Sequence, residues 1–379
     1  MKITLPKSEL EKFLNLSSYL KISNESISFS PITEYILVNI KNGFCKFTLT
    51  TTGNFVTYMF STSHQTQENF LLSYTELKKF YSSKRSDNLI ITETKISDGT
   101  FNSKHIVKDD IKIELFPSVT SISGLQSKRI SKATINQILV SKKYIKEESK
   151  DKLIPTYNHS NILGKQILSS DGFISFLYSL PIEENLEFIF FSSSEIDLIR
   201  NFEYFDYIKT DNWNIIKYKT IVFGKRLIEG VSPAFFPLLK RYIEILKKDV
   251  KITIPVERFY DFCKTVKTYT KDETVNSYLT ILENGIRLSY TDHQNAIELD
   301  EIISCNQVGF EVGYRICFTQ SVLLKVFDSL GSDYINLSEC VEENGNKGYI
   351  GFWLDSDPNF HSICSKGFEL QKQDVTETL

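Results

Sequence analysis

The chain has 379 residues, of which 41% are hydrophobic and 24% charged, and its formal net charge at pH 7 is −3. This composition predicts a soluble globular protein with little disorder, and the 28 Phe and 19 Tyr favour β-strands. Residues 1–20 lack the apolar core and the small-residue cleavage site of a signal peptide, and no run of about 18 apolar residues occurs, so we expect a cytoplasmic protein.

The first predicted helix begins near Pro6, because proline fits the first turn of a helix. Its apolar residues recur at i, i+3, i+4 and i+10, the one-sided stripe of an amphipathic helix: Leu10, Phe13, Leu14 and Leu20. Residues 34–52 then form two β-rich runs joined by Asn42-Gly43, a strong hairpin signal. A second helix is predicted at about 73–83, followed by a β-rich run from Asp87.

The stripe of the first helix recurs twice along the chain. A shift of 125 residues gives Ile135, Ile138, Leu139 and Ile145, and a further 124 residues give Phe259, Phe262, Cys263 and Tyr269. Second helices are predicted at about 193–202 and 319–330, with a charged, partly helical connection at 240–251. We therefore predict an α+β fold of three repeated domains (helix, strands, helix, strands) at residues 1–122, 128–250 and 251–368, followed by a C-terminal tail at 369–379.

Catalytic motifs are missing from the sequence: no nucleophile elbow, P-loop, H-E-x-x-H or G-x-G-x-x-G stands at a strand-to-helix junction. The six cysteines show no C-x-x-C pair and no zinc-ligand spacing to histidine, so we expect buried free thiols: Cys45, Cys263, Cys305, Cys317, Cys340 and Cys364. Asp171 and Asp292 lie in equivalent turns after strands, where a carboxylate usually caps backbone N–H groups. We therefore predict no catalytic centre, metal or cofactor; a nucleic-acid-processing enzyme that uses these two carboxylates is an alternative.

Charge is distributed unevenly between the predicted helices and the rest of the chain. The six helix segments together carry +8, although the whole chain carries −3. If the helices share one side, that side is basic and suits a phosphate backbone. Segment 192–203 carries −2 and is an exception. Ordinary solvated helix faces explain the same numbers, so charge alone leaves both interpretations open.

Three segments resemble signatures of the bacterial DNA polymerase III beta subunit, the sliding clamp: residues 168–181 (LSSDGFISFLYSLP), 227–235 (LIEGVSPAF) and 312–325 (VGYRICFTQSVLLK). With the triplication, the resemblance covers about residues 1–368. It implies a non-enzymatic processivity factor built as a head-to-tail homodimer, a closed ring with twelve helices lining the hole and sheets outside. Such a ring encircles duplex DNA without sequence preference and holds it by topology.

The resemblance also implies sites. Basic residues of the predicted helices are candidates to face DNA: Lys12, Lys78, Lys79, Lys84, Arg85, Lys132, Lys143, Arg200, Lys264, Lys267 and Lys325. Clamps of this family bind short peptide motifs of polymerases and clamp-loader subunits in an apolar pocket between their second and third domains. The matching positions are Gly172, Phe173, Ile174, Pro233, Leu238, Ile363 and Cys364.

Two further expectations follow from the resemblance. Ring closure would join the first domain of one chain to the third domain of the other, which makes Ile106 and Tyr269 candidates for the dimer interface. Phe173-Ile174 stands where the family usually has a basic pair, which predicts partners with a motif of their own. The altered pocket and the acidic segment 192–203 favour one alternative, a clamp-fold interaction scaffold that does not close a ring on DNA.

Overall fold

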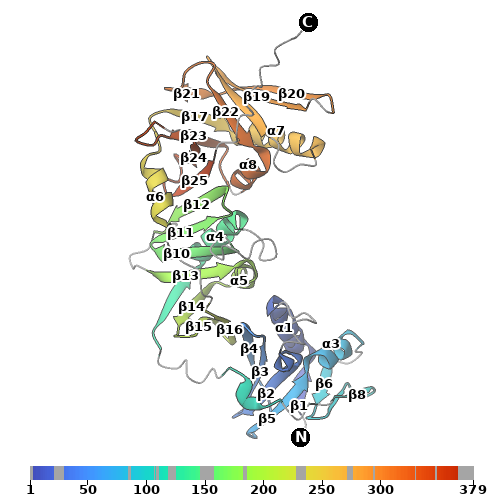
Figure 1. Cartoon of the computed structure of the whole chain (residues 1–379). Helices are drawn as coiled ribbons and strands as arrows, with labels where there is room; N and C mark the ends of the chain where they lie inside the picture. Colours follow the sequence, from blue (N-terminus) through green and yellow to red (C-terminus); the bar gives the residue numbers. More distant parts are fainter. Residues whose placement is uncertain are drawn as a thin grey trace. The chain divides into compact units, whose positions relative to one another are not determined.

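The computed structural model describes residues 3–20, 30–83, 87–105, 107, 111–117, 125–145, 158–181, 186–227, 236–270, 276–292, 295–328, 330–345 and 348–365. Within these ranges every strand pair is antiparallel, and helices pack against the sheets (Figure 1). The predicted α+β class is therefore confirmed. None of the helices in these ranges is long and apolar enough to cross a membrane.

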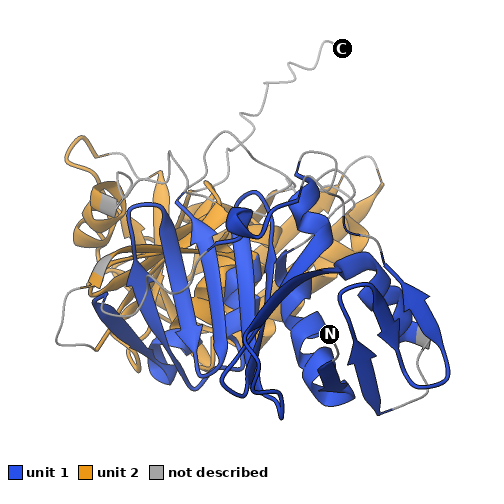
Figure 2. Cartoon of the chain, turned by 90° about the horizontal axis from the view of Figure 1, so that it is seen from below, with its two compact units in different colours: residues 1–136, 194–229 blue, residues 137–193, 230–379 orange. Residues whose placement is uncertain are grey.

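The chain divides into two compact units, shown in separate colours in Figure 2. Unit 1 comprises residues 1–136 and 194–229, and unit 2 comprises residues 137–193 and 230–379. Because residues 128–250 are shared between the two units, this division does not follow the three predicted domains. The three-domain boundaries stay a prediction.

Unit 1 contains two sheets. The larger has the strand order β5 (Glu68–Ser73), β2 (Tyr35–Lys41), β3 (Phe44–Thr50), β4 (Asn54–Ser61), β16 (Ile221–Arg226), β15 (Trp213–Tyr218), β14 (Tyr204–Lys209), β9 (Ser127–Ser131). The smaller has the order β1 (Ile3–Pro6), β6 (Asn88–Ile91), β7 (Lys95–Ser97), β8 (Asn102–Lys104). The helices are α1 (Lys7–Ser17), α3 (Tyr74–Ser83), most of α5 (Ser193–Ile199) and the start of α4 (Lys132–Ser141), with short 3-10 turns η1 (Ser18–Leu20), η2 (Pro31–Glu34) and η3 (Ile113–Leu115).

Unit 2 also contains two sheets. The larger has the order β13 (Leu186–Ser192), β10 (His159–Gly164), β11 (Gln166–Ser170), β12 (Ile174–Ser179), β25 (Phe360–Ser365), β24 (Tyr349–Trp353), β23 (Tyr334–Cys340), β17 (Lys251–Pro255), β21 (Asn306–Val308). The smaller has the order β20 (Ile297–Ser304), β19 (Gly285–Asp292), β18 (Asn276–Leu282), β22 (Arg315–Thr319). Its helices are the end of α4, α6 (Phe236–Glu244), α7 (Val256–Tyr269) and α8 (Gln320–Phe327), with the 3-10 turn η5 (Lys142–Tyr144).

The predicted amphipathic stripes form the core contacts of the helices. The first two stripe positions are fully or nearly fully buried in all three repeats: Leu10 and Phe13, Ile135 and Ile138, Phe259 and Phe262. Phe13 meets Phe47 edge to face at 5.2 Å between ring centroids, and Phe259 meets Phe318 in the same way at 5.4 Å. Helices α1 and α7 are thus held to their sheets by equivalent aromatic contacts.

The helix predictions were accurate in position and less so in length. All six predicted helices occur, although α5 ends at Ile199, three residues before the predicted end. The connection predicted at 240–251 was placed too late, because helix α6 already begins at Phe236. Its apolar residues Leu239, Tyr242 and Ile243 pack on the larger sheet of unit 2, which stabilises this helix.

The two Asn-Gly hairpins differ by one residue. Asn42 and Gly43 both have positive φ (52° and 79°), as a tight two-residue turn between β2 and β3 requires. In the later hairpin the turn falls on residues 283–284, because Gly285 already pairs with Leu282. A Cβ atom at Gly285 would lie 2.3 Å from the Ile303 carbonyl oxygen, so glycine there permits the close approach of β20.

Candidate functional site

The basic residues of α1 and α3 are exposed on their helices. Lys12 pairs with Glu9 (Nζ–Oε1 2.7 Å), and Lys79 pairs with Glu76 (Nζ–Oε1 3.0 Å). Lys78 is also exposed. Exposed pairs of this kind hold a lysine weakly, so its charge stays available to an anionic ligand. Lys84 and Arg85 lie outside the described residues.

Part of the acidic charge of segment 192–203 is buried in the interior of unit 1. Glu195 is buried, and its Oε2 accepts a hydrogen bond from the buried Lys225 Nζ at 3.0 Å. Arg200 pairs with Asp197 at 3.3 Å, and Lys132 Nζ donates to the Arg200 carbonyl oxygen at 2.8 Å. The surface of unit 1 at this helix is therefore less acidic than the sequence sum suggested.

Lysines of unit 2 fall into two groups. Lys264 and Lys267 are exposed on α7, with Lys264 Nζ 4.6 Å from the Tyr260 ring centroid. Lys143 instead donates to the carbonyl oxygen of Asp328. Lys325, half-buried on α8, forms an ion pair with Asp171. The second group thus ties elements of unit 2 together, a role that sequence alone did not predict.

The Asp171-Gly172 turn between β11 and β12 is built by its own polar groups. Asp171 Oδ1 accepts hydrogen bonds from the backbone N–H groups of Phe173 (2.9 Å) and Ile174 (3.0 Å). Gly172 has φ 94°, a left-handed conformation that favours glycine. The predicted capping role of Asp171 is confirmed. At the tip of the turn, the Phe173 side chain is 62% exposed.

The two faces of the larger sheet of unit 2 separate the predicted pocket residues. Strand alternation puts Ile363 on the face covered by α6, where it packs with Leu168, Leu177 and Leu239; we call this the α6 face. Its neighbour Cys364 and the paired Ile174 point to the opposite face, and both are buried. Figure 1 shows α6 on one side of these strands and α8 on the other, and the contact between the rings of Phe327 and Phe352 agrees with this arrangement.

The α6 face includes residues that the sequence analysis missed. Tyr349 and Trp353 of β24 lie on this face, and the Tyr349 ring contacts that of Tyr242 of α6, with 4.2 Å between the ring centroids and a tilt of 35°. Between them, Gly351 leaves room for Leu246, which follows α6: an added Cβ would lie 2.5 Å from Leu246 Cδ1. Tyr349, Gly351 and Trp353 alternate along the strand, a sequence pattern that places all three on the same face of the sheet. Leu238 of α6 is 52% exposed, and Pro233 lies outside the described residues.

A buried histidine lies at the edge of the α6 face. His361 Nε2 is 2.8 Å from Lys248 Nζ, and Lys248 lies 5.3 Å from the Trp353 ring centroid. Burial, and then the charge of Lys248, lower the pKa of His361 to about 4. Burial also lowers the pKa of Lys248. His361 is therefore neutral at pH 7 and accepts a hydrogen bond from the ammonium group.

Edge strands and one exposed aromatic residue mark the candidate interface. Tyr269, at the end of α7, is 56% exposed and does not belong to the core. Ile106 lies outside the described residues. Strand β20 ends the order of its sheet and carries the exposed Ile302, while β8 ends the order of another and carries the exposed Lys104.

The groups considered for catalysis have structural roles. Asp292 accepts hydrogen bonds from the backbone N–H of Asn295 (3.2 Å) and from its Nδ2 (2.7 Å), which confirms the predicted cap. All six cysteines are free thiols, buried except for the half-buried Cys305. Burial raises the pKa of Cys45 to about 12 and that of Cys305 to about 11, so both are thiols at neutral pH. Among the described residues, no three His, Cys, Asp or Glu side chains gather as metal ligands.

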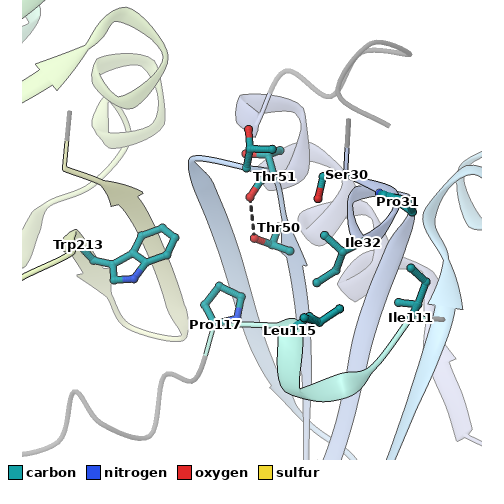
Figure 3. A pocket seen from close by; sticks show the side chains of 10 residues that line it. Ser30, Pro31, Ile32, Thr50, Thr51, Ile111, Leu115, Pro117 and Trp213 are labelled. Atoms are coloured by element: carbon teal, nitrogen blue, oxygen red, sulfur yellow. Dashed lines mark hydrogen bonds between the residues drawn. The ribbon is translucent and has the colours of Figure 1, made fainter. Parts of the chain in front are cut away.

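Among the described residues, unit 1 has surface cavities of about 420 and 430 Å³. The first is lined by Thr50, Ile32, Leu115, Pro117 and Trp213, among others (Figure 3). The second borders β5 and contains His105. Neither includes a site residue predicted from the sequence. The first has apolar and threonine side chains in its walls, and the second combines apolar residues with Asn69, Glu93 and His105.

Comparison with known proteins identifies the fold. No protein-family model and no curated protein sequence matches the chain. Among solved structures, it is similar to the beta sliding clamp of Caulobacter crescentus (TM-score 0.80, 15% identity, 97% of this chain and 99% of that one). It is also similar to the DNA polymerase III beta subunit of Thermotoga maritima (TM-score 0.75, 15% identity, coverage 97% and 99%). A third similar structure is the Pseudomonas aeruginosa sliding clamp bound to griselimycin (TM-score 0.78, 12% identity, coverage 97% and 100%).

The chain therefore has the fold of the bacterial DNA polymerase III beta subunits over nearly its whole length. At 12–15% identity it is a divergent example of that fold. The resemblance predicted from three sequence segments is confirmed for the fold.

Proposed function

We propose that this protein is a DNA sliding clamp of the cytoplasm, a non-enzymatic processivity factor that encircles duplex DNA as a homodimer and tethers a polymerase. The observation that carries the proposal is the similarity to sliding clamps over 97% of this chain and 99% of the Caulobacter chain. A fold alone does not fix function, so the proposal also rests on features of this chain.

Ring closure is supported by a joint that occurs twice within the chain. In unit 1, β4 pairs antiparallel with β16, and in unit 2, β12 pairs antiparallel with β25. In both cases the third strand of a meander (β2-β3-β4 or β10-β11-β12) pairs with the last strand of a second kind of antiparallel segment (β9-β14-β15-β16 or β17-β23-β24-β25). The third meander (β18-β19-β20) ends in β20, and the remaining segment of the second kind (β1-β6-β7-β8) ends in β8. We infer that β20 of one chain pairs with β8 of a second, which closes a two-chain ring.

The chemistry of the two edges supports this pairing. Strand β20 presents Glu298 and the exposed Ile302, and β8 presents Lys104, next to the exposed Phe101 of the preceding turn. A long edge strand with exposed apolar residues is an aggregation hazard unless another strand covers it. Pairing with β8 would bury Ile302 and bring opposite charges together.

Contacts to DNA are proposed for the exposed lysines of the helices. Lys12, Lys78, Lys264 and Lys267 are exposed and lie on α1, α3 and α7. Such side chains make weak contacts to phosphates that carry no sequence information. A ring held by topology needs no stronger contact, because tight binding would oppose sliding.

Partner binding is proposed for two exposed apolar residues of unit 2: Phe173 at the tip of the turn between β11 and β12, and Leu238 on α6. Short peptide motifs of a polymerase or of clamp-loader subunits would bury these side chains. Exposed large apolar residues of this kind often mark interaction sites.

The proposal is tested first by the mass in solution, measured by light scattering over a dilution series. A mass of twice 43.8 kDa that persists on dilution supports the ring. The dimer is then incubated with linear duplex DNA whose ends are afterwards blocked with streptavidin or left open. A ring is retained at high salt only on DNA with blocked ends. A monomer at every concentration would favour the scaffold that does not close, and equal loss from both DNAs would contradict encirclement.

A further inference from the structure

The turn that displays Phe173 is joined to helix α8 by one buried carboxylate. The Asp171 side chain is only 5% exposed, and its two carboxylate oxygens bond to different partners. Oδ1 accepts hydrogen bonds from the N–H groups of Phe173 and Ile174, while Oδ2 accepts one from the Lys325 ammonium group. The cation therefore neutralises the same carboxylate that fixes the backbone of the turn.

Further hydrogen bonds join the turn to its own sheet. Gly172 N–H donates to Ser170 Oγ at 3.1 Å, and Ser365 N–H donates to the Phe173 carbonyl oxygen at 3.3 Å. These contacts come from the sheet itself. Asp171 also links the turn to helix α8, through its bond with Lys325, 154 residues away in sequence.

Helix α8 is also held at its C-terminal end. Lys143 donates to the Asp328 carbonyl oxygen, and Tyr260 of α7 donates to Asp328 Oδ1 at 2.7 Å. Because the helix is fixed there, Lys325 one turn earlier is held near Asp171. The Lys325 side chain is nevertheless 36% exposed, so part of it is in contact with solvent.

We propose that Lys325 is a positioning residue for partner recognition: its pair with Asp171 sets the turn that displays Phe173 and couples that turn to the helix side of the ring. The coupling rests on the proposed clamp function, in which α8 belongs to the helices that face DNA. A DNA phosphate near α8 competes with Asp171 for Lys325. Release of Lys325 leaves a buried carboxylate with only its two N–H donors, which loosens the turn. By linkage, a partner that needs the ordered turn weakens the contact of Lys325 with DNA by the same factor.

The first test measures hydrogen exchange of the Phe173 and Ile174 amides without DNA. In Lys325→Met we expect exchange about tenfold faster than in the wild type, since the cation that supports the capping carboxylate is lost. Lys325→Arg, which keeps the charge, should restore most of the protection. Lys251→Met removes another Lys–Asp pair of unit 2 (Lys251–Asp355, 3.3 Å) and should leave these amides unchanged. Equal exchange in the wild type and Lys325→Met overturns the positioning role.

The second test separates the pair from the cap. Asp171→Asn keeps an oxygen for the two N–H groups and removes the charge that attracts Lys325. If the pair acts as a unit, adding Lys325→Met to Asp171→Asn should change the exchange less than twofold, whereas independent roles give the full tenfold change again.

Binding and DNA coupling are read with defined probes. Griselimycin, the compound bound to the Pseudomonas clamp, should bind Lys325→Met about tenfold more weakly than wild type. Addition of a 30-base-pair duplex should speed exchange of the Phe173 amide in the wild type and not in Lys325→Met. Equal griselimycin affinity in the wild type and Lys325→Met would overturn the link between the pair and partner binding. Absence of a duplex effect would overturn the DNA coupling, and with it α8 as a DNA-facing helix, whereas the exchange without DNA tests the pair independently of the clamp proposal.

Discussion

Lys225 and Glu195 form an ion pair in the interior of unit 1, with a Nζ–Oε2 distance of 3.0 Å and side chains that are 6% and 3% exposed. Lys225 extends from β16, and Glu195 lies in the first turn of α5. The pair therefore fixes this helix to the strand that joins β4. A charge in this position is expensive to bury unless its partner is present.

Lys225→Met should destabilise unit 1 by about 3–5 kcal/mol, because it removes the Lys225 ammonium group from the buried Glu195 carboxylate. The chain has two tryptophans, Trp213 in unit 1 and Trp353 in unit 2, so Trp353→Phe provides a background in which urea unfolding of unit 1 is followed by fluorescence. The double variant Glu195→Gln/Lys225→Met should recover part of the loss. A single variant with the wild-type midpoint would mean that the carboxylate reaches water.

Gly224→Ala should destabilise the junction of β16 and β4. A Cβ at Gly224 would lie 2.1 Å from Cε1 of Phe55, whose ring meets Trp213 edge to face at 5.1 Å. The Phe55 ring must move, at a cost of about 1–3 kcal/mol for an overpacked site. Gly53→Ala is the matched control, since no atom lies within 4 Å of its added Cβ. Urea unfolding followed by Trp213 fluorescence should show a lower midpoint for Gly224→Ala alone; equal midpoints would contradict the close packing.

The lowered pKa of the buried His361 predicts that unit 2 loses stability in acid. Its pKa is lowered to about 4 in the folded protein, chiefly by burial, whereas the unfolded chain binds a proton near the ordinary value of 6.5. Between these values the unfolded state holds more protons, so stability is present above about pH 6.5 and is lost as the pH falls toward 4. The loss amounts to about 2–3 kcal/mol.

The measurement follows Trp353 fluorescence during urea unfolding from pH 7 to pH 4 in a Trp213→Phe background. His361→Gln should flatten the pH dependence, because glutamine does not titrate. His64→Gln changes a histidine of unit 1 and should leave the Trp353 transition as in the wild type. A pH dependence that His361→Gln leaves intact would assign the effect to other groups.

Local patterns in the sequence were sufficient to predict the helices and the repeats. Within each stripe, represented by Phe13, Ile138 and Phe262, the apolar residues recur with the helical period. Burial of one side of each helix follows directly. Strand alternation also contained information that the pocket prediction did not use. Ile363 and Cys364 are neighbours in one strand, so they cannot share a face, and only Ile363 lies on the α6 face.

Contacts between residues far apart in sequence were not predictable in this way. Lys325 looked like any helix lysine, and its pairing with Asp171 depends on a fold that brings residues 154 positions apart together. Glu195 of α5 likewise looked like a surface acid, because its cation is 30 residues away, on strand β16. Pattern predicts which side of an element is buried, whereas charge pairing requires the topology.

Leu238→Asp should abolish binding of the cognate polymerase without changing the assembly of the chain. Leu238 is 52% exposed on α6, so its replacement costs little folding free energy, but a carboxylate there would have to be desolvated against an apolar partner. Leu115→Asp changes a comparably exposed leucine (59%) of unit 1 and serves as the matched control. Polymerase capture and light scattering on both variants make the test: unchanged capture by Leu238→Asp would exclude this surface from the partner site, and an altered mass would show that the substitution acts on assembly instead.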